Sequence, residues 1–347
     1  MLMKVYPNNI PEHDIYDVFY ANGRIHIYRP PNKPKVEVKL NGKVSKGYSG
    51  HIQEYSFAHP YVEKVELEVE GEKFLVDVRT YDNLKDEVAL CTMVKNEDNY
   101  IVQWIEYHLL VGFKKFVIYD NKNSPNTRYK SDETDSDLEN VLADYIKKGI
   151  VMLIEWPYPK NYLGVNTSSQ KVQQHHCLTL FKKAKYLGFI DIDEYINISN
   201  FKDQQIEGIL DKLIQPRNAG VQLWCKFFQN NEGKSEKGYD FLKITNFFYC
   251  INGDPNKPRY ANNNSPKFII VPSRVNACAI HNFGPMKGYR SNVIKSYESL
   301  YFNHYYFLNK RNLKKWRCNR KCIHNDDTLT HYYDKLFKEK EQSKEDS

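Results

Sequence analysis

The ten residues at positions 187–196, LGFIDIDEYI, constrain the fold of this chain more than any other stretch. The first four have the apolar character of a strand core, and Asp191, Asp193 and Glu194 follow almost at once. In open α/β sheets, ligands bind at the edge formed by the carboxyl ends of the strands. The stretch therefore predicts an α/β fold with an acidic site at the end of this strand.

The pair of aspartates indicates a metal site. An extended or turning backbone returns alternate side chains to roughly the same side, so Asp191 and Asp193 can both face one cation. Hard cations such as Mn²⁺ and Mg²⁺ prefer oxygen ligands. A solvated acidic turn has the same composition, and the triplet alone leaves both interpretations open.

Composition sets broad limits on the class of protein. A chain of 347 residues with 41% hydrophobic content predicts a globular protein with one large core and a smaller module. It contains no apolar run long enough to cross a bilayer, and its seven scattered cysteines are typical of reduced thiols. We therefore expect a soluble, cytoplasmic protein without a transmembrane segment. The net charge of +7 fits a site for an anionic nucleotide as well as it fits a polyanion.

The first part of the chain, residues 1–85, has the pattern of a small all-β module. Asn-Gly pairs at 22–23 and 41–42 favour the positive φ angles of tight hairpin turns, and apolar residues alternate on both sides of Gly71. Three hairpins without a helical period predict a β-sandwich or a barrel. The module either binds carbohydrate or another partner, or packs against the next domain, and we favour packing.

From position 88 the pattern changes to alternating strands and helices. The run VALCTMV is continuously apolar, as expected of a strand that is buried on both faces. A helix follows, which Asn96 can cap and Gly112 can end, and a later helix begins near Ser168 or Ser169. Two further strands, KKFVIYD and IVMLIEW, lie between them. This order predicts a half-Rossmann sheet whose fourth strand ends in D-x-D.

The position of D-x-D after a fourth strand argues against other families that use related motifs. Phosphatases of the haloacid-dehalogenase type place D-x-D-x-[TV] after their first strand, and Tyr195 stands where the threonine or valine would be. Neither G-x-x-x-x-G-K-[ST] nor G-x-G-x-x-G occurs, so the P-loop and dinucleotide fingerprints are missing.

Three segments carry a more specific resemblance: ALCTMVKNEDNYIVQW, Q-x₅-HCL and FIDIDEYI. They resemble the GT-A-fold glycosyltransferases of family 92 and related family 2-like proteins. The resemblance implies a Rossmann-like GT-A domain, which we place at residues 86–322, after the β module. Residues 323–347 are rich in charge without an apolar period and predict a charged tail.

The resemblance also implies which residues bind the donor and the metal. In such enzymes the segment after the first strand lines the nucleotide pocket, an acid after the second strand faces the base or ribose, and D-x-D binds the metal that bridges the donor diphosphate. The donor-binding residues implied here are Thr92, Lys95, Asn96, Glu97, Asp120, Asn121, Gln170, Asp191 and His281. The metal ligands implied are Asp191, Asp193 and His304. A late histidine often completes this site in GT-A enzymes, and His281 is the alternative to His304.

Later segments match the family pattern with departures. PKFIIVPSRVNACAIHNFG and SLYFNHYYF match its Lys-Pro-His and His-Tyr elements. Relatives usually carry an acid before the Cys-Leu pair, where this chain has His175-His176. These histidines either alter donor contacts or are merely a packed surface pair, and for His175 we favour the second interpretation. Phe228-Gln229 replaces a Phe-Gly pair in the acceptor-side strand, so the acceptor preference stays open.

By resemblance we expect an inverting transfer, which requires a carboxylate base within hydrogen-bond reach of the attacking hydroxyl. The acceptor-side strand at 221–228 leads into a polar turn whose first acid is Glu232, and Asp240 is the second. Both acids also fit ordinary turn chemistry.

These observations predict a metal-dependent glycosyltransferase of the hexosyltransferase type with Mn²⁺ or Mg²⁺ as its cofactor. The expected partners are a nucleotide-sugar donor and a glycan or other hydroxyl acceptor, and not nucleic acid. Two alternatives stay open: a non-catalytic glycan-binding protein with a degenerate transferase domain, and a metal-dependent phosphoesterase.

Overall fold

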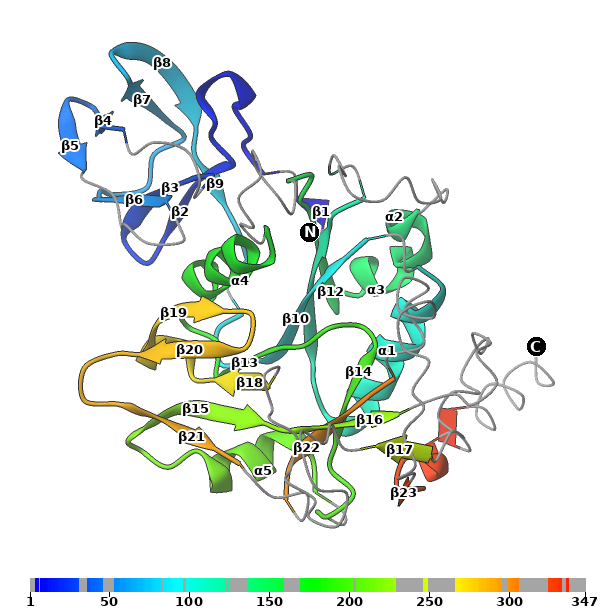
Figure 1. Cartoon of the computed structure of the whole chain (residues 1–347). Helices are drawn as coiled ribbons and strands as arrows, with labels where there is room; N and C mark the ends of the chain where they lie inside the picture. Colours follow the sequence, from blue (N-terminus) through cyan, green and yellow to red (C-terminus); the bar gives the residue numbers. More distant parts are fainter. Residues whose placement is uncertain are drawn as a thin grey trace.

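A computed structural model of the chain shows a large mixed sheet, a second sheet beside it and a β-rich N-terminal part (Figure 1). The structure describes residues 4–5, 7–30, 36–45, 53–82, 84–95, 98–122, 124, 137–158, 169–201, 204–228, 246–248, 266–294, 299–305, 324–332 and 335–336. None of the helices in these ranges is long and apolar enough to cross a membrane.

The large sheet has eight strands in the order β1-β12-β11-β10-β13-β18-β15-β21. Their bounds are β1 Lys4–Val5, β10 Val88–Val94, β11 Lys115–Asp120, β12 Val151–Glu155, β13 Tyr186–Phe189, β15 Asn218–Leu223, β18 Lys267–Ile270 and β21 Arg290–Val293. Strands β10 to β13 are parallel to one another, whereas β18 is antiparallel to both of its neighbours. The expected order of strands and helices from position 88 is therefore observed. The chain order reverses between β10 and β13, which both lie at the centre of the sheet.

Helices cover both faces of this sheet (Figure 1). They are α1 Asp98–Val111, α2 Leu138–Val141, α3 Ala143–Lys147, α4 Ser169–Leu180 and α5 Ile206–Leu213. Gly112 follows α1 with a φ of +108°, as expected of a helix-ending glycine. Along β10, Val88 and Leu90 pack into the core that contains α1, and Ala89 and Cys91 pack into the core that contains α4. This alternation explains why the whole strand is apolar.

A five-stranded sheet with the order β14-β22-β16-β17-β23 begins directly after β13. Its strands are β14 Glu194–Asn197, β16 Cys225–Phe228, β17 Asn246–Phe248, β22 Tyr301–His304 and β23 His324–Asn325. The chain leaves β13 at Ile190 and turns through residues 191–193, where the amide of Glu194 donates to the carbonyl of Asp191 at 3.1 Å. The sequence did not indicate this second sheet. A two-stranded sheet, β19 Val275–Ala279 and β20 Asn282–Pro285, follows the short helix η3 Pro272–Arg274.

Two four-stranded sheets precede β10 and share one apolar core. Their strands are β2 Asp17–Ala21, β3 Arg24–Arg29, β6 Gln53–Ala58 and β9 Arg79–Thr80 in one sheet, and β4 Val38–Leu40, β5 Lys43–Ser45, β7 Lys64–Val69 and β8 Glu72–Asp77 in the other. Hairpins form at all three expected turns, where Gly23, Gly42 and Gly71 have positive φ angles. The short helix η1 Pro11–His13 precedes β2. Strand β1, by contrast, pairs with β12 in the large sheet.

Candidate metal and nucleotide site

The acidic triplet lies where the order of the parallel strands reverses. Asp191 and Asp193 occupy the turn between β13 and β14, at the carboxyl end of β13. The end of β10 lies beside it, because β13 pairs with β10 in parallel. This is the place where open α/β sheets bind ligands, because the chains leaving neighbouring strands diverge there and open a crevice.

Asp191 is held by two side chains from other elements. The amide of Gln170, in the first turn of α4, donates to Asp191 Oδ1 at 2.8 Å. The ammonium of Lys267, the first residue of β18, donates to Asp191 Oδ2 at 2.6 Å. Desolvation by the surrounding protein opposes ionisation of Asp191, but the charge of Lys267 outweighs it and lowers the pKa of Asp191 below its ordinary value. The carboxylate therefore stays ionised although its partner is buried.

Asp193, Glu194 and His304 form a compact group of possible metal ligands. One ligand atom from each lies within 4.8 Å of the others. His304 Nε2 is 3.3 Å from Asp193 Oδ2, and His304 Nδ1 is 3.7 Å from Glu194 Oε1. Strand pairing creates this proximity, because Glu194 of β14 stands directly opposite His304 of β22. Two carboxylates and an imidazole suit Mn²⁺, which accepts both oxygen and nitrogen ligands, so the residues fit the metal implied by the sequence.

The site concentrates negative charge around one buried ammonium. Lys267 also lies 3.2 Å from Glu194 Oε2, and its side chain is only 2% exposed. Burial disfavours the ammonium, but the carboxylates of Asp191 and Glu194 outweigh this effect and raise the pKa of Lys267. Burial raises the pKa of Glu194 to about 7. For His304, burial favours the neutral ring, but the charge of Asp193 outweighs it and raises the pKa of the imidazole.

Helix α1 fixes the backbone of β14. The indole of Trp104 donates to the carbonyl of Glu194 at 3.0 Å, and the hydroxyl of Tyr107 donates to that of Ile196 at 2.8 Å. The amide of Ile196 donates to Nε2 of His108 at 3.2 Å. Burial lowers the pKa of His108 to about 3, so this imidazole stays neutral and accepts the bond. These three bonds tie α1 to the edge of β14 that is not paired with β22.

Neither Lys267 nor Glu194 was among the donor-binding and metal-binding residues predicted from the sequence, although Glu194 belongs to the acidic site expected after the strand. Lys267 lies in the segment that matches the Lys-Pro-His element of the family pattern, and this match is the one feature of the sequence that points to a role for Lys267 in the site. Its position follows from the pairing of β13 with β18, in which Phe189 stands opposite Phe268. This pairing brings the start of β18 to the end of β13.

The predicted donor residues on β10 and β11 lie at the same edge of the sheet. Thr92 is buried, and its hydroxyl oxygen has no hydrogen-bond partner in the part of the chain that the structure describes. The ammonium of Lys95 donates to the carbonyl oxygen and the hydroxyl of Ser124 at 2.9 and 2.8 Å. Asn96 and Glu97 fall outside the described residues.

Asp120, the last residue of β11, and Asn121, which follows it, have different surroundings. Asp120 accepts a bond from the amide of Lys122 at 2.9 Å, and burial raises the pKa of its carboxyl. The side-chain amide of Asn121 donates to the carbonyls of Trp156 and Tyr158 at 2.5 and 2.9 Å. Asn121 therefore ties the end of β11 to the residues that follow β12.

The remaining predicted residues are more distant or not described. His281 lies in the turn between β19 and β20, with Nδ1 3.3 Å from the carbonyl oxygen of Pro266. Burial and the charge of Lys267 lower the pKa of His281. It does not belong to the group of three possible ligands found among the described residues. The candidate bases Glu232 and Asp240, like Gln229, lie outside those residues.

The histidine pair on α4 faces the N-terminal sheets and not the acidic site. His175 Nε2 lies 2.9 Å from Glu54 Oε2, and His176 Nε2 lies 3.0 Å from Asp17 Oδ2. Both rings are nearly completely buried. His175 is therefore packed, as we expected, but it is buried and does not lie on the surface.

Comparison with known proteins defines the class. The family model described as Glycosyltransferase family 92 matches residues 86–340, which is most of the chain. The chain thus belongs to glycosyltransferase family 92.

Curated relatives carry the same family name. A family 92 protein of Oryza sativa subsp. japonica is 27% identical over 143 residues, which are 41% of this chain and 21% of the relative. One from Ricinus communis is 28% identical over 125 residues, 36% of this chain and 18% of the relative. One from Arabidopsis thaliana is 25% identical over 122 residues, 35% of this chain and 18% of the relative. The matches thus span only about a fifth of these relatives' length.

Proposed function

We propose that this protein is a metal-dependent glycosyltransferase with a GT-A-type domain, which moves a sugar from a nucleoside-diphosphate sugar to a glycan or another hydroxyl acceptor. The observation that carries the proposal is the group of Asp193, Glu194 and His304, whose ligand atoms lie within 4.8 Å of one another at the end of β13. Family membership supports the transfer chemistry.

In this proposal, Asp193 and His304 hold Mn²⁺ or Mg²⁺ together with Glu194. A metal bound there neutralises the charge that develops on the departing nucleoside diphosphate. Asp191 is engaged by Lys267 and Gln170 and remains 40% exposed, so we assign it to a donor hydroxyl or a metal-bound water. The ammonium of Lys267 favours the charged forms of the crowded carboxylates and so opposes the effect of their burial, because an opposite charge lowers the pKa of a carboxyl group.

The ends of β10 and β11 supply the nucleotide pocket in this proposal. The hydroxyl of Thr92, which has no partner among the described residues, and the carboxyl of Asp120 lie on neighbouring strands, at registers two residues apart. Buried polar groups normally have a hydrogen-bond partner, so the hydroxyl of Thr92 is suited to form a hydrogen bond with a ligand. We assign these groups, with Lys95, to contacts with the donor.

The test is to incubate the protein with a panel of nucleotide sugars and Mn²⁺, with and without a chelator, and to measure release of nucleoside diphosphate. Slow hydrolysis of one donor that stops with the chelator and in Asp193→Asn supports the proposal. Absence of turnover with every donor, in Mn²⁺ and in Mg²⁺, contradicts it. Retention on a glycan array without turnover would identify a binding protein, and release of phosphate from simple esters would identify a phosphoesterase.

A further inference from the structure

The five-stranded sheet presents two different faces. Side chains alternate along a strand, so Glu194 and His304 lie on one face while Asn197, Tyr301 and Asn303 lie on the other. The first face carries the proposed metal ligands. The second face is covered by polar residues from a distant part of the chain, near the C-terminus.

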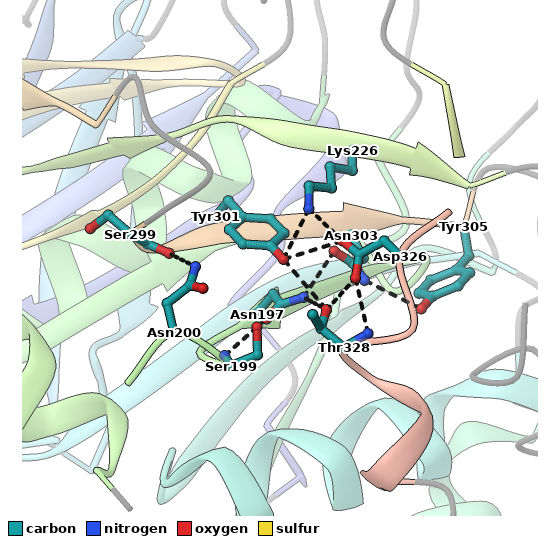
Figure 2. A network of polar contacts seen from close by, with 10 residues as sticks. All are labelled: Asn197, Ser199, Asn200, Lys226, Ser299, Tyr301, Asn303, Tyr305, Asp326 and Thr328. Carbon is teal, nitrogen blue, oxygen red and sulfur yellow. Dashed lines mark hydrogen bonds and ion pairs between the residues drawn. The ribbon is translucent and has the colours of Figure 1, made fainter. Parts of the chain in front are cut away.

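A buried ion pair lies on this second face (Figure 2). Lys226 of β16 contacts Asp326, which follows β23, and the two side chains are 11% and 4% exposed. The hydroxyl of Tyr301 lies 3.2 Å from Lys226 Nζ and 3.3 Å from Asp326 Oδ2. Removing two charges from water is costly unless their geometry is well satisfied, so a pair of this kind specifies one arrangement of the strand and the segment.

Thr328 extends the contact to the strand of Glu194. Asp326 Oδ1 accepts bonds from the amide and the hydroxyl of Thr328 at 2.9 and 2.5 Å. The side-chain amide of Asn197 donates to the hydroxyl of Thr328 at 2.8 Å and to Asn303 Oδ1 at 3.3 Å (Figure 2). A continuous path of polar contacts therefore joins β16, the C-terminal segment, β14 and β22.

The same segment reaches β14 by a second route. Leu329 and Tyr332 are buried in the main core. The ring of Tyr332 lies 5.1 Å from that of Tyr107, which donates to the carbonyl of Ile196. Strand β14 is thus held by two separate sets of contacts that involve residues 326–332.

We infer that the C-terminal segment at 324–332 is a positioning element for the proposed metal site. By fixing Asn197 and Asn303 on one face of the sheet, it sets the spacing of Glu194 and His304 on the other. This inference rests on the proposed function, because it names how that site is kept in register. Asp326 and Thr328 are positioning residues, and neither contacts the ligand group directly.

The experiment uses two variants and two measurements. Asp326→Asn removes the negative charge of the buried pair and leaves the positive charge of Lys226. Thr328→Val is a milder change that removes only a hydroxyl. Amide hydrogen exchange in the metal-free protein is expected to become faster within β14 and β22, while exchange in β10 stays unchanged. Mn²⁺ alone, added to each protein, is expected to bind about 10–100-fold more weakly than to the wild type.

A matched control separates positioning from general destabilisation. Leu67→Ala weakens the buried core of the N-terminal sheets, far along the chain from the network. It is expected to lower stability without changing exchange in β14 and β22 or the affinity for Mn²⁺. Uniformly faster exchange in both test variants, or no change in β14 and β22, would overturn the inference. If the wild type binds no Mn²⁺, the proposed metal site fails, and the exchange measurement still decides the positioning role.

Discussion

At the scale of single residues, the two aspartates of the motif have different surroundings. Asp193 lies 3.3 Å from His304 in the ligand group, whereas Asp191 is bound by Lys267 and Gln170. Losing a direct metal ligand costs more than losing an indirect one. We expect Asp193→Ala to abolish transfer at any Mn²⁺ concentration and Asp191→Asn to retain part of it, as measured by Mn²⁺ titration of activity. Full activity of Asp193→Ala without metal would mean that the site is wrongly assigned.

The catalytic base is a second prediction at this scale. We expect either Glu232→Gln or Asp240→Asn to lower the rate of transfer by about 10²–10⁴-fold, which is the usual contribution of proton removal. Affinity for the donor should not change, because the base acts on the acceptor. Rates and donor affinity are measured separately for each variant. Normal transfer by both variants, or a product that keeps the donor's anomeric configuration, would exclude this assignment.

The sequence indicated the residues of the site unevenly. Asp191 and Asp193 follow a strand that is readable from its apolar run, and His304 was indicated by resemblance. Lys267 was missed, and Glu194 was noted beside the aspartates without being assigned as a ligand, because the roles of both depend on which strands pair. Strand β18 enters beside β13 from a distant part of the chain, and β14 pairs with β22 from near its end. Local periodicity carries no information about such long-range pairing.

At the scale of elements, Gly220 allows β15 to approach β18, the strand of Lys267. A Cβ atom there would lie 2.5 Å from the carbonyl oxygen of Ile269 and 2.8 Å from Cα of Ile270. Both atoms belong to the backbone and cannot move alone. We expect Gly220→Ala to lower the free energy of unfolding by about 1–3 kcal/mol, as overpacking usually does, measured by denaturant titration.

Gly208 in α5 provides the matched control for this substitution. A Cβ atom at Gly208 meets nothing within 4 Å. Alanine is a better helix former than glycine, so Gly208→Ala should raise the free energy of unfolding by about 0.5–1 kcal/mol. If Gly220→Ala and Gly208→Ala had the same effect, close packing at β15 would not explain the glycine.

The contact between α4 and β6 should make stability depend on pH. Burial of Glu54 opposes its ionisation, but hydrogen bonds with His175 and His26 outweigh this effect and lower its pKa well below the usual value. A depressed carboxyl pKa stabilises the fold above the unfolded-state pKa of about 4.3, and this contribution is lost as the pH falls below that value. We expect the free energy of unfolding to fall more steeply on acidification in the wild type than in Glu54→Gln.

Denaturant titrations at a series of acidic pH values measure this difference. Glu66→Gln is the control, because Glu66 pairs with Lys73 at 3.1 Å on the surface, where both side chains are about half exposed. Exposed pairs contribute little to stability. Equal acid sensitivity of the wild type and Glu54→Gln would contradict the assigned role of the buried carboxylate.

Elements were predictable to the extent that their signals are local. The hairpins at 22–23 and 41–42 formed because Asn-Gly favours positive φ angles, and α1 ended at Gly112 for a related reason. The five-stranded sheet was not predicted. Its strands are short and widely separated along the chain, and each one pairs with a strand from a distant segment. Their own sequences therefore give no sufficient signal for the sheet.

At the scale of the whole molecule, α4 connects the N-terminal sheets to the proposed site. Its first turn carries Gln170, which contacts Asp191. Its later turns are bound by the N-terminal sheets, because Tyr28 shares a 2.7 Å hydrogen bond with Thr179 and Asp17 contacts His176. The family match begins at residue 86, so these sheets lie outside it. Their polar, buried face on α4 supports a role in packing the transferase domain.

The central claim is that a metal held by Asp193, Glu194 and His304 binds the donor diphosphate. The most direct measurement is a calorimetric titration of nucleoside diphosphates into the protein, with and without Mn²⁺, repeated with Asp193→Asn. We predict that one diphosphate binds the wild type tightly only when Mn²⁺ is present and that Asp193→Asn loses this dependence together with the affinity. Equal binding with and without metal, unchanged in Asp193→Asn, would contradict the claim.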